Sequence, residues 1–208
     1  MVHRFRTAIG IAASALMLVG ASSLARADEA QALARAQEII GGRCFLCHGA
    51  RGEAASELFP RLAAQNAEYI AKQLANFKSG ERKSDTMKGM AADLAPQDMR
   101  ALGLFFSRQP SPPHAVSDPA LAAEGQTIYA QGGAAIPVSA CTGCHGPQGH
   151  GSTTLPRLAG QVAAYLETQL KQFGKRVRTN DNAIMQDIAA RMTEREIKAV
   201  AEYLSTLD

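Results

Sequence analysis

One short pattern occurs twice in the chain and uses all of its cysteines. It reads Cys-Phe-Leu-Cys-His at residues 44–48 and Cys-Thr-Gly-Cys-His at residues 141–145. C-x-x-C-H is the attachment signature of a c-type haem. Two thiols three residues apart on one helical turn reach the two vinyl groups of one porphyrin edge, and the adjacent histidine then lies under the iron. The pattern predicts two covalently bound haem c groups.

Two other uses of paired cysteines compete with this prediction. A structural zinc site is disfavoured because the gap between the pairs is far longer than in compact zinc modules, and such a site gives the trailing histidines no role. Vicinal redox cysteines of the thioredoxin type need a βαβ context, and the chain has no alternating apolar pattern of strand length. Haem attachment is the use that accounts for every residue of both motifs.

The N-terminus has the pattern of an export signal. His3, Arg4 and Arg6 precede an apolar run over residues 8–24, and residues 25–27, Ala-Arg-Ala, have the small-x-small form that signal peptidase cuts after. We predict a signal peptide at residues 1–27 and a periplasmic mature protein, with a retained membrane anchor as the alternative. Removal of the three arginines in this segment changes the net charge from +3 to about zero. The remaining charges are evenly mixed and do not indicate a nucleic-acid-binding surface.

The rest of the chain is an internal duplication. Residues 60–77 are identical to residues 156–173 at ten of eighteen positions, beginning with Pro-Arg-Leu-Ala. Between the halves, residues 109–119 contain four prolines, which remove backbone donors and restrict the residues before them. We predict the following parts: an N-terminal domain at residues 28–109, a Pro-rich linker at 110–118 and a C-terminal domain at 119–208.

Both halves have helical periodicity. The expected helices lie at residues 30–40, 67–77, 96–106, 121–130, 162–173 and 193–207. Asp118 and Pro119 have the form of a helix cap followed by a first-turn proline, and Thr193 with Glu196 has the form of a capping box. The predicted fold class is all-α, built from two tandem domains.

The duplication also selects the second axial ligand of each iron. Met87 lies 39 residues after His48, and Met185 lies 40 residues after His145, each just before a closing helix. Histidine–methionine ligation favours ferrous iron, raises the potential and fills the sixth site, which is typical of an electron carrier. The other candidates align with apolar residues of the opposite half and are interpreted as core residues: Met90, Met99 and Met192. Met90 stays open as a substitute for Met87.

Other side chains are candidates for supporting roles. A haem histidine normally gives its second ring N–H to an acceptor, and the carbonyls of Pro60 and Pro156 are candidates, although prolines that only start a turn explain the same residues. His114 and His150 have no counterparts in the opposite half, and we interpret them as surface residues. Four arginines are candidate partners of the haem propionates, against the default of solvated charges: Arg61, Arg82, Arg157 and Arg178.

Taken together, these residues resemble the dihaem cytochrome c4 family. The resemblance rests on the signal peptide, two C-x-x-C-H-G motifs, Pro-Arg-Leu-Ala-x-Gln in both halves and Tyr-x-x-x-Gln-Leu, and it covers residues 28–208. It implies two cytochrome c-like domains related by a pseudo-twofold axis, with the propionate edges of the haems near one another. The chain departs modestly from the pattern at Gly103 and Phe106, where the second half has Ala201 and Leu204. The resemblance implies two ligand sets, Cys44, Cys47, His48 and Met87 for one haem, and Cys141, Cys144, His145 and Met185 for the other.

The resemblance further implies a periplasmic electron carrier. Such a protein accepts electrons from a quinol-oxidising complex and delivers them to a terminal oxidase, often at the membrane surface. Two alternatives remain, a cytochrome subunit of a larger dehydrogenase and a dihaem peroxidase, and the symmetrical methionines argue against the second. No general acid or base, nucleophile or phosphate-binding loop is evident. We therefore expect an electron carrier with protein partners, and neither an enzyme nor a protein that binds a small-molecule substrate or nucleic acid.

Overall fold

The computed structural model of the chain describes residues 26–133 and 138–208. The predicted signal peptide, residues 1–27, lies outside this range except for its last two residues. The described residues form helices and loops, with one isolated bridge between Gly133 and Val138 and no strand. None of their helices is long and apolar enough to cross a membrane. The all-α prediction is confirmed.

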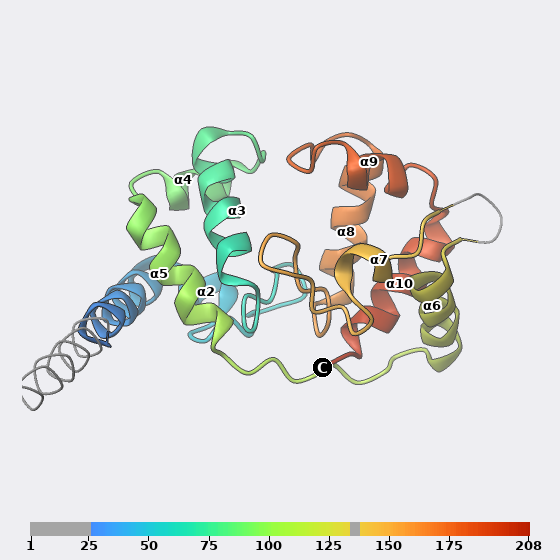
Figure 1. The fold of residues 1–208 in the computed structure, drawn as a ribbon, viewed down its shortest axis with the longest axis horizontal. Helices are drawn as coiled ribbons and strands as arrows, with labels where there is room; N and C mark the ends of the chain where they lie inside the picture. The colour runs from blue at the N-terminus through green and yellow to red at the C-terminus, as the bar shows by residue number, and fades with distance from the viewer. Residues whose placement is uncertain (1–25, 134–137) are drawn as a thin grey trace, which may run out of the picture.

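The helices follow the same order in both halves of the chain (Figure 1). The first half contains a helix at residues 26–39, η1 (Ile40–Cys44), α2 (Phe45–His48), α3 (Ala67–Ser79), α4 (Asp85–Ala91) and α5 (Pro96–Ser107). The second half contains α6 (Pro119–Gln131), α7 (Thr142–His145), α8 (Ala163–Gly174), α9 (Ile184–Ala189) and α10 (Glu194–Ser205). The six helices expected from periodicity are all present, whereas α4 and α9 were not expected as helices.

Both predicted caps are present in the second half. The Asp118 side chain caps α6, where it accepts hydrogen bonds from the N–H groups of Ala120 and Leu121, each at 3.0 Å. At the start of α10 the Thr193 hydroxyl accepts from the N–H of Glu196 at 3.2 Å, and the Glu196 carboxylate accepts from the N–H of Thr193 at 2.8 Å. These bonds satisfy donors that a helix N-terminus leaves free, so the two helix starts are determined by nearby residues.

Each half has its own hydrophobic core. In the first half the buried side chains of Ile39, Ile70 and Phe106 join the first helix, α3 and α5. In the second half Tyr129 and Leu204 join α6 to α10. Separate cores are expected of a chain that folds as two tandem domains.

Gly103 sets the approach of α5 to α3 in the first core. A Cβ atom at this position would lie 2.3 Å from the carbonyl oxygen of Ala67 on α3, so the observed crossing needs glycine. Phe106, one turn further along α5, is fully buried. Gly103 and Phe106 therefore differ from their counterparts because the first core is packed differently. It has a smaller residue than Ala201 where α5 approaches α3, and a larger side chain than Leu204 one turn later.

The two halves lie side by side, with α3 and α8 facing each other across the junction (Figure 1). The Gln65 side chain donates to the carbonyl oxygen of Arg157 at 2.9 Å and accepts from its N–H at 2.8 Å. Gln161 makes the same two bonds with Arg61, at 2.8 Å and 2.7 Å. Equivalent residues of the two halves thus exchange equivalent bonds, as the pseudo-twofold relation requires.

The connection between α5 and α6 is docked on α10. The Glu202 carboxylate accepts hydrogen bonds from the N–H groups of Ser117 and Asp118 at 2.6 Å and 3.0 Å. The N–H of His114 donates to the last carbonyl of α10 at 3.0 Å, and its Nε2 atom is buried without a hydrogen-bond partner in the described part of the chain. His114 is therefore half-buried where a surface residue was expected, because the connection packs against α10. His150 is exposed, as expected.

Candidate haem sites

The two C-x-x-C-H motifs lie on short helices at corresponding places in the two halves. Cys44 ends η1 and Cys47 lies on α2, whereas Cys141 caps α7 and Cys144 lies on it. The two thiols of each motif are one helical turn apart, as two bonds to one porphyrin edge require. All four cysteines are free, so neither motif forms a disulfide.

Each motif histidine is buried and oriented by one hydrogen bond. Nδ1 of His48 is 3.0 Å from the carbonyl oxygen of Pro60, and Nδ1 of His145 is 3.2 Å from that of Pro156. A carbonyl oxygen can only accept, so Nδ1 carries the hydrogen and Nε2 keeps its lone pair. This is the usual arrangement of a metal-binding histidine. The prediction that prolyl carbonyls accept these hydrogen bonds is confirmed.

Burial favours the neutral form of the motif histidine and of the first thiol in each site. Loss of hydration lowers the pKa of His48 and His145, and the bond to the prolyl carbonyl opposes this only in part. Neutral imidazole is the form that binds a metal. Burial likewise raises the pKa of the Cys44 thiol, and it raises the pKa of Cys141 to about 11. Each site therefore presents a neutral, largely apolar surface with one nitrogen able to bind iron.

A glycine with positive φ follows each motif histidine. Gly49 has a φ of 78° and Gly146 a φ of 76°, values that other residues rarely adopt. A Cβ atom at Gly49 would also lie 2.4 Å from the Glu53 side chain. The turn ends the histidine-bearing helix, so the glycine that completes each C-x-x-C-H-G motif is required by the backbone.

The aligned methionines lie on two short helices that the apolar periodicity of the sequence does not predict. Met87 is on α4 and Met185 is on α9, and both are half-buried. The hydroxyl of Ser84 caps α4 and accepts from the N–H of Met87 at 3.3 Å. A serine three residues before Met87 is the capping signal that would have revealed α4.

Packing distinguishes the candidate methionines of the first half. Met87 and Cys44 pack against the same hydrophobic core, whereas Met90 is 40 % exposed. Met90 is thus a surface side chain and not the core residue that its alignment indicates. The other two methionines assigned to cores do pack there, Met99 in the first half and Met192 in the second.

The four arginines predicted to meet the propionates lie at the junction of the halves. Arg61 donates through Nη1 to the carbonyl oxygen of Gly160 at 2.7 Å. Burial lowers the pKa of Arg61 and Arg157, and the charge of Arg157 lowers that of Arg61 further. Arg82 and Arg178 are buried at the same junction. In residues 26–133 and 138–208 no acidic side chain forms an ion pair with any of these four, so the junction is electropositive.

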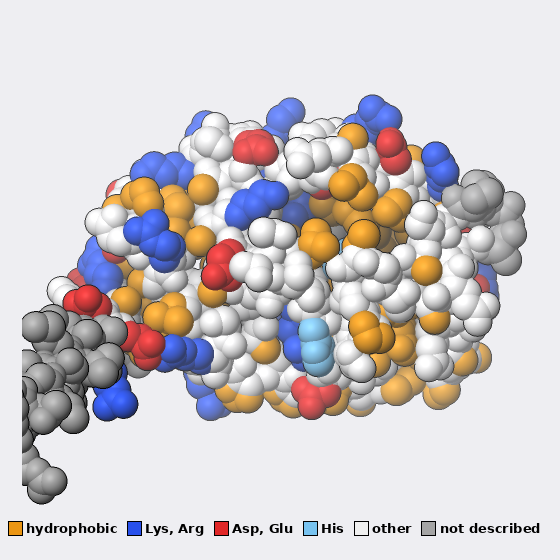
Figure 2. Space-filling view, in the orientation of Figure 1, with side chains coloured by type: hydrophobic (Ala, Val, Ile, Leu, Met, Phe, Trp, Pro, Cys, Tyr) orange, Lys and Arg blue, Asp and Glu red, His pale blue; other side chains and the backbone are white. Residues whose placement is uncertain are grey.

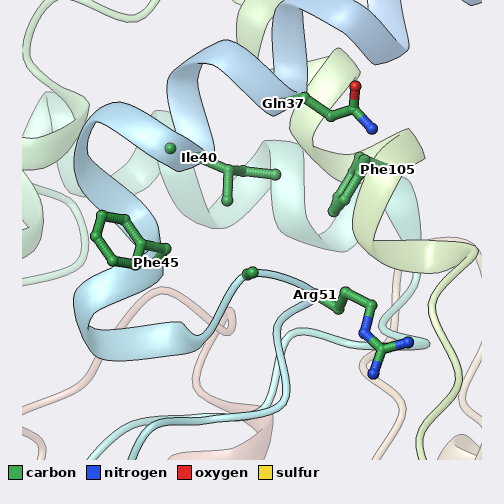
Figure 3. Close-up of a pocket in the computed structure, with 7 residues that line it drawn as sticks. Gln37, Ile40, Phe45, Arg51 and Phe105 are labelled. Atoms are coloured by element: carbon green, nitrogen blue, oxygen red, sulfur yellow. The ribbon is translucent and has the colours of Figure 1, made fainter.

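In the second half, apolar surface lies beside the methionine-bearing helix α9. Apolar side chains gather in a hollowed area over α8 and α9 (Figure 2). A separate crevice of about 450 Å³ lies between the first helix with α2, the loop after α2, and α5 (Figure 3), lined by Gln37, Ile40, Gly41, Phe45, Ala50, Arg51 and Phe105. No cysteine, histidine or methionine lines this crevice, so it is not the haem site of the first half.

The described residues do not provide the alternative sites. No three His, Cys, Asp or Glu side chains of residues 26–133 and 138–208 are grouped to hold a metal ion, so structural zinc has no ligand set there. A thioredoxin-like motif has no strand to follow in the same residues. The paired thiols, the oriented histidines and the apolar surroundings fit a covalently bound haem in each half.

Comparisons with known proteins agree with this chemistry. A model of the cytochrome c family matches residues 122–208. Cytochrome c4 of Thiocapsa roseopersicina is 41% identical over 170 residues, which cover 80% of this chain and 88% of the relative. A thiosulfate dehydrogenase electron acceptor of Stutzerimonas stutzeri strain A1501 is 38% identical over 204 residues, covering 91% and 94%.

A solved structure has the same fold. Reduced recombinant cytochrome c4 from Pseudomonas stutzeri matches with a TM-score of 0.77 and 36% identity, over 83% of this chain and 97% of that one. The match spans both halves, in agreement with two tandem cytochrome c domains. Similarity over nearly the whole of these relatives, together with two C-x-x-C-H motifs, identifies haem c as the cofactor and electron transfer as the activity. The chain belongs to the cytochrome c4 family.

Proposed function

We propose that this cytochrome is a periplasmic dihaem carrier that takes electrons from a quinol-oxidising complex to a terminal oxidase, in peripheral contact with the membrane. One observation carries the proposal: both halves repeat a histidine oriented by a prolyl carbonyl and a half-buried methionine on a short helix. Two equivalent centres with filled axial positions suit electron transfer and discourage the binding of O2 or peroxide. The export pattern of residues 1–27 supports the periplasmic location.

In this proposal each half holds one haem through four residues. The first set is Cys44, Cys47, His48 and Met87, and the second is Cys141, Cys144, His145 and Met185. The bound haem supplies one-electron iron chemistry. The chain anchors the porphyrin through the cysteines, orients the imidazole through the prolyl carbonyl and surrounds the site with apolar side chains. We propose that the two units correspond to residues 28–109 and 119–208, joined by residues 110–118.

Optical spectra of the purified holoprotein test the ligands. We expect the ferric protein to show the methionine-to-iron band and the ferrous protein to ignore carbon monoxide at both haems. Met87→Ala and Met185→Ala should each remove about half of the band and open one haem to the gas. Met90→Ala is the matched control, because that side chain is exposed, and it should leave the band intact. Loss of the band in Met90→Ala with retention in Met87→Ala would reverse the assignment in the first half.

Washed membranes that contain quinol-oxidising and terminal oxidase complexes test the route. We expect the holoprotein to be reduced when quinol is supplied, and the reduced protein to be oxidised when oxygen is admitted. Inhibition of the quinol-oxidising complex should stop the first step only. Reduction that is equally fast without membranes would show that the proposed donor is wrong.

The similarity to a thiosulfate dehydrogenase electron acceptor favours a second candidate function. In that case the direct donor is a dehydrogenase in place of a quinol-oxidising complex. Incubation of the oxidised holoprotein with thiosulfate and a purified thiosulfate dehydrogenase distinguishes the two. Rapid reduction that requires both thiosulfate and enzyme supports the second candidate, and no reduction removes it.

A further inference from the structure

Two buried arginines occupy the junction between the halves without an acidic partner. Arg82 is 9% exposed and Arg178 is 7% exposed. Each guanidinium stacks on a phenylalanine of its own half, Arg82 on Phe77 at 4.6 Å and Arg178 on Phe173 at 4.4 Å. Neither forms an ion pair with an aspartate or glutamate among the described residues. Buried charges are costly unless paired, so this arrangement calls for a functional explanation.

The guanidinium of Arg82 is bonded to both halves. Its Nη1 donates to Gln73 of its own half at 2.9 Å. Its Nη2 donates to the Tyr165 hydroxyl and to Gln169 of the second half, each at 2.8 Å. Phe77, on which Arg82 stacks, belongs to the core against which Cys44 and Met87 pack, so this charge lies near the haem site of the first half while it is bonded to the second half.

Arg178 makes the reciprocal set of bonds. Its Nη1 donates to Gln169 of its own half at 2.8 Å. Its Nη2 donates to the Tyr69 hydroxyl and to Gln73 of the first half, at 2.9 Å and 3.1 Å. Because Gln73 and Gln169 each accept from both arginines, the two guanidiniums form one connected group.

The surroundings respond to this shared charge. Burial by itself raises the pKa of the Tyr165 phenol, but the charges of Arg82 and Arg178 lower it below its ordinary value. The other side chains of the group are neutral amides and hydroxyls, which orient the charge without cancelling it. A positive charge in a partly desolvated site acts over a longer range than one in water.

We propose that Arg82 and Arg178 act as one shared cation that sets the potentials of both haems and couples them. A nearby positive charge disfavours the ferric form of a haem relative to the ferrous form, so it raises the potential. Haem c also brings propionate carboxylates, whose negative charge favours the ferric form. A cation that neutralises them would therefore also raise the potential. The inference rests on the proposed electron-carrier function, and it assigns to these arginines a tuning role and not a catalytic one.

Redox titration of the full-length holoprotein tests the proposal. We expect Arg82→Gln to lower the potentials of both haems, raising each ferric-to-ferrous ratio at fixed ambient potential about 3- to 10-fold, or roughly 30–60 mV at about 59 mV per decade. The potentials are assigned by following the paramagnetically shifted haem methyl signals of each half. Arg100→Gln is the matched control, since Arg100 is exposed on α5, and it should move neither potential.

A second variant separates charge from architecture. Arg82→Lys keeps the charge but loses the planar fork that reaches two acceptors, so it should retain most of the native potentials. If Arg82→Gln lowers only one potential, or neither, the shared-cation proposal is overturned. An equal shift in Arg82→Lys and Arg82→Gln would also overturn it, because the effect would then follow geometry and not charge. Failure of the proposed electron route would instead appear as lost turnover with membranes while both potentials remain native.

Discussion

The substitution Gln65→Leu should weaken the junction between the two halves. Gln65 is 7% exposed, and its amide makes two hydrogen bonds with the backbone of Arg157 at 2.9 Å and 2.8 Å. A net hydrogen bond contributes about 1 kcal/mol, and a buried group left without a partner costs about 1–3 kcal/mol. Leucine has a similar volume but pairs with neither backbone group. We therefore expect the free energy of unfolding to fall by roughly 3 kcal/mol.

Thermal unfolding of the holoprotein, followed by circular dichroism, measures this loss. If the chain unfolds as one unit, the expected loss lowers the Tm by roughly 6–12 °C. Gln97→Leu is a matched control because Gln97 is exposed on α5, and it should change stability by no more than about 0.5 kcal/mol. Gln161→Leu should cost as much as Gln65→Leu, and the double variant should cost less than the sum, since the two pairs of bonds share one junction. Equal Tm values for Gln65→Leu and Gln97→Leu would refute the conclusion that the exchanged bonds stabilise the junction.

Three further substitutions test other parts of the fold. Gly103→Ala should lower the free energy of unfolding by about 1–3 kcal/mol because the added Cβ atom meets the α3 backbone. Gly89→Ala has open space around it, so it should be neutral or stabilise α4 by up to about 1 kcal/mol. Denaturant midpoints that rank the two variants in the opposite order would contradict this packing. Hydrogen bonds from the Ala95 N–H and from Arg35 lower the pKa of Asp98, so its stabilisation is complete above the unfolded pKa of about 3.9 and is lost as the pH falls through the lower folded value. Urea midpoints measured from about pH 6 to pH 3 should therefore fall less in Asp98→Asn than in the native protein, and identical slopes would show that Asp98 makes no such contribution.

Local features of the structure could be predicted from the sequence. The two C-x-x-C-H motifs, the helix that carries each of them and the glycine that follows depend on residues within one or two helical turns. The caps at Asp118 and Thr193 are equally local, and both are present as predicted. Duplication extended this reasoning to the carbonyls of Pro60 and Pro156, because a role repeated in both halves is easier to recognise than a single one.

Features that depend on distant residues could not be predicted in the same way. Met90 aligns with an apolar residue of the other half, yet it lies at the surface. His114 has the sequence context of an exposed linker, yet it is half-buried and its Nε2 atom is covered. In both cases the exposure of the side chain depends on which element packs beside it, and no local pattern carries that information.

The sequence by itself determined the cofactor class, the six longer helices and the twofold repetition, because each of these follows from spacing along the chain. The tertiary structure decided how the halves meet. The bonds that Arg82, Arg178 and Gln65 make across the junction join residues 83 to 109 positions apart. Such pairs form only when two separately folded cores present complementary donors and acceptors, so the arginine group at the junction became visible only in three dimensions.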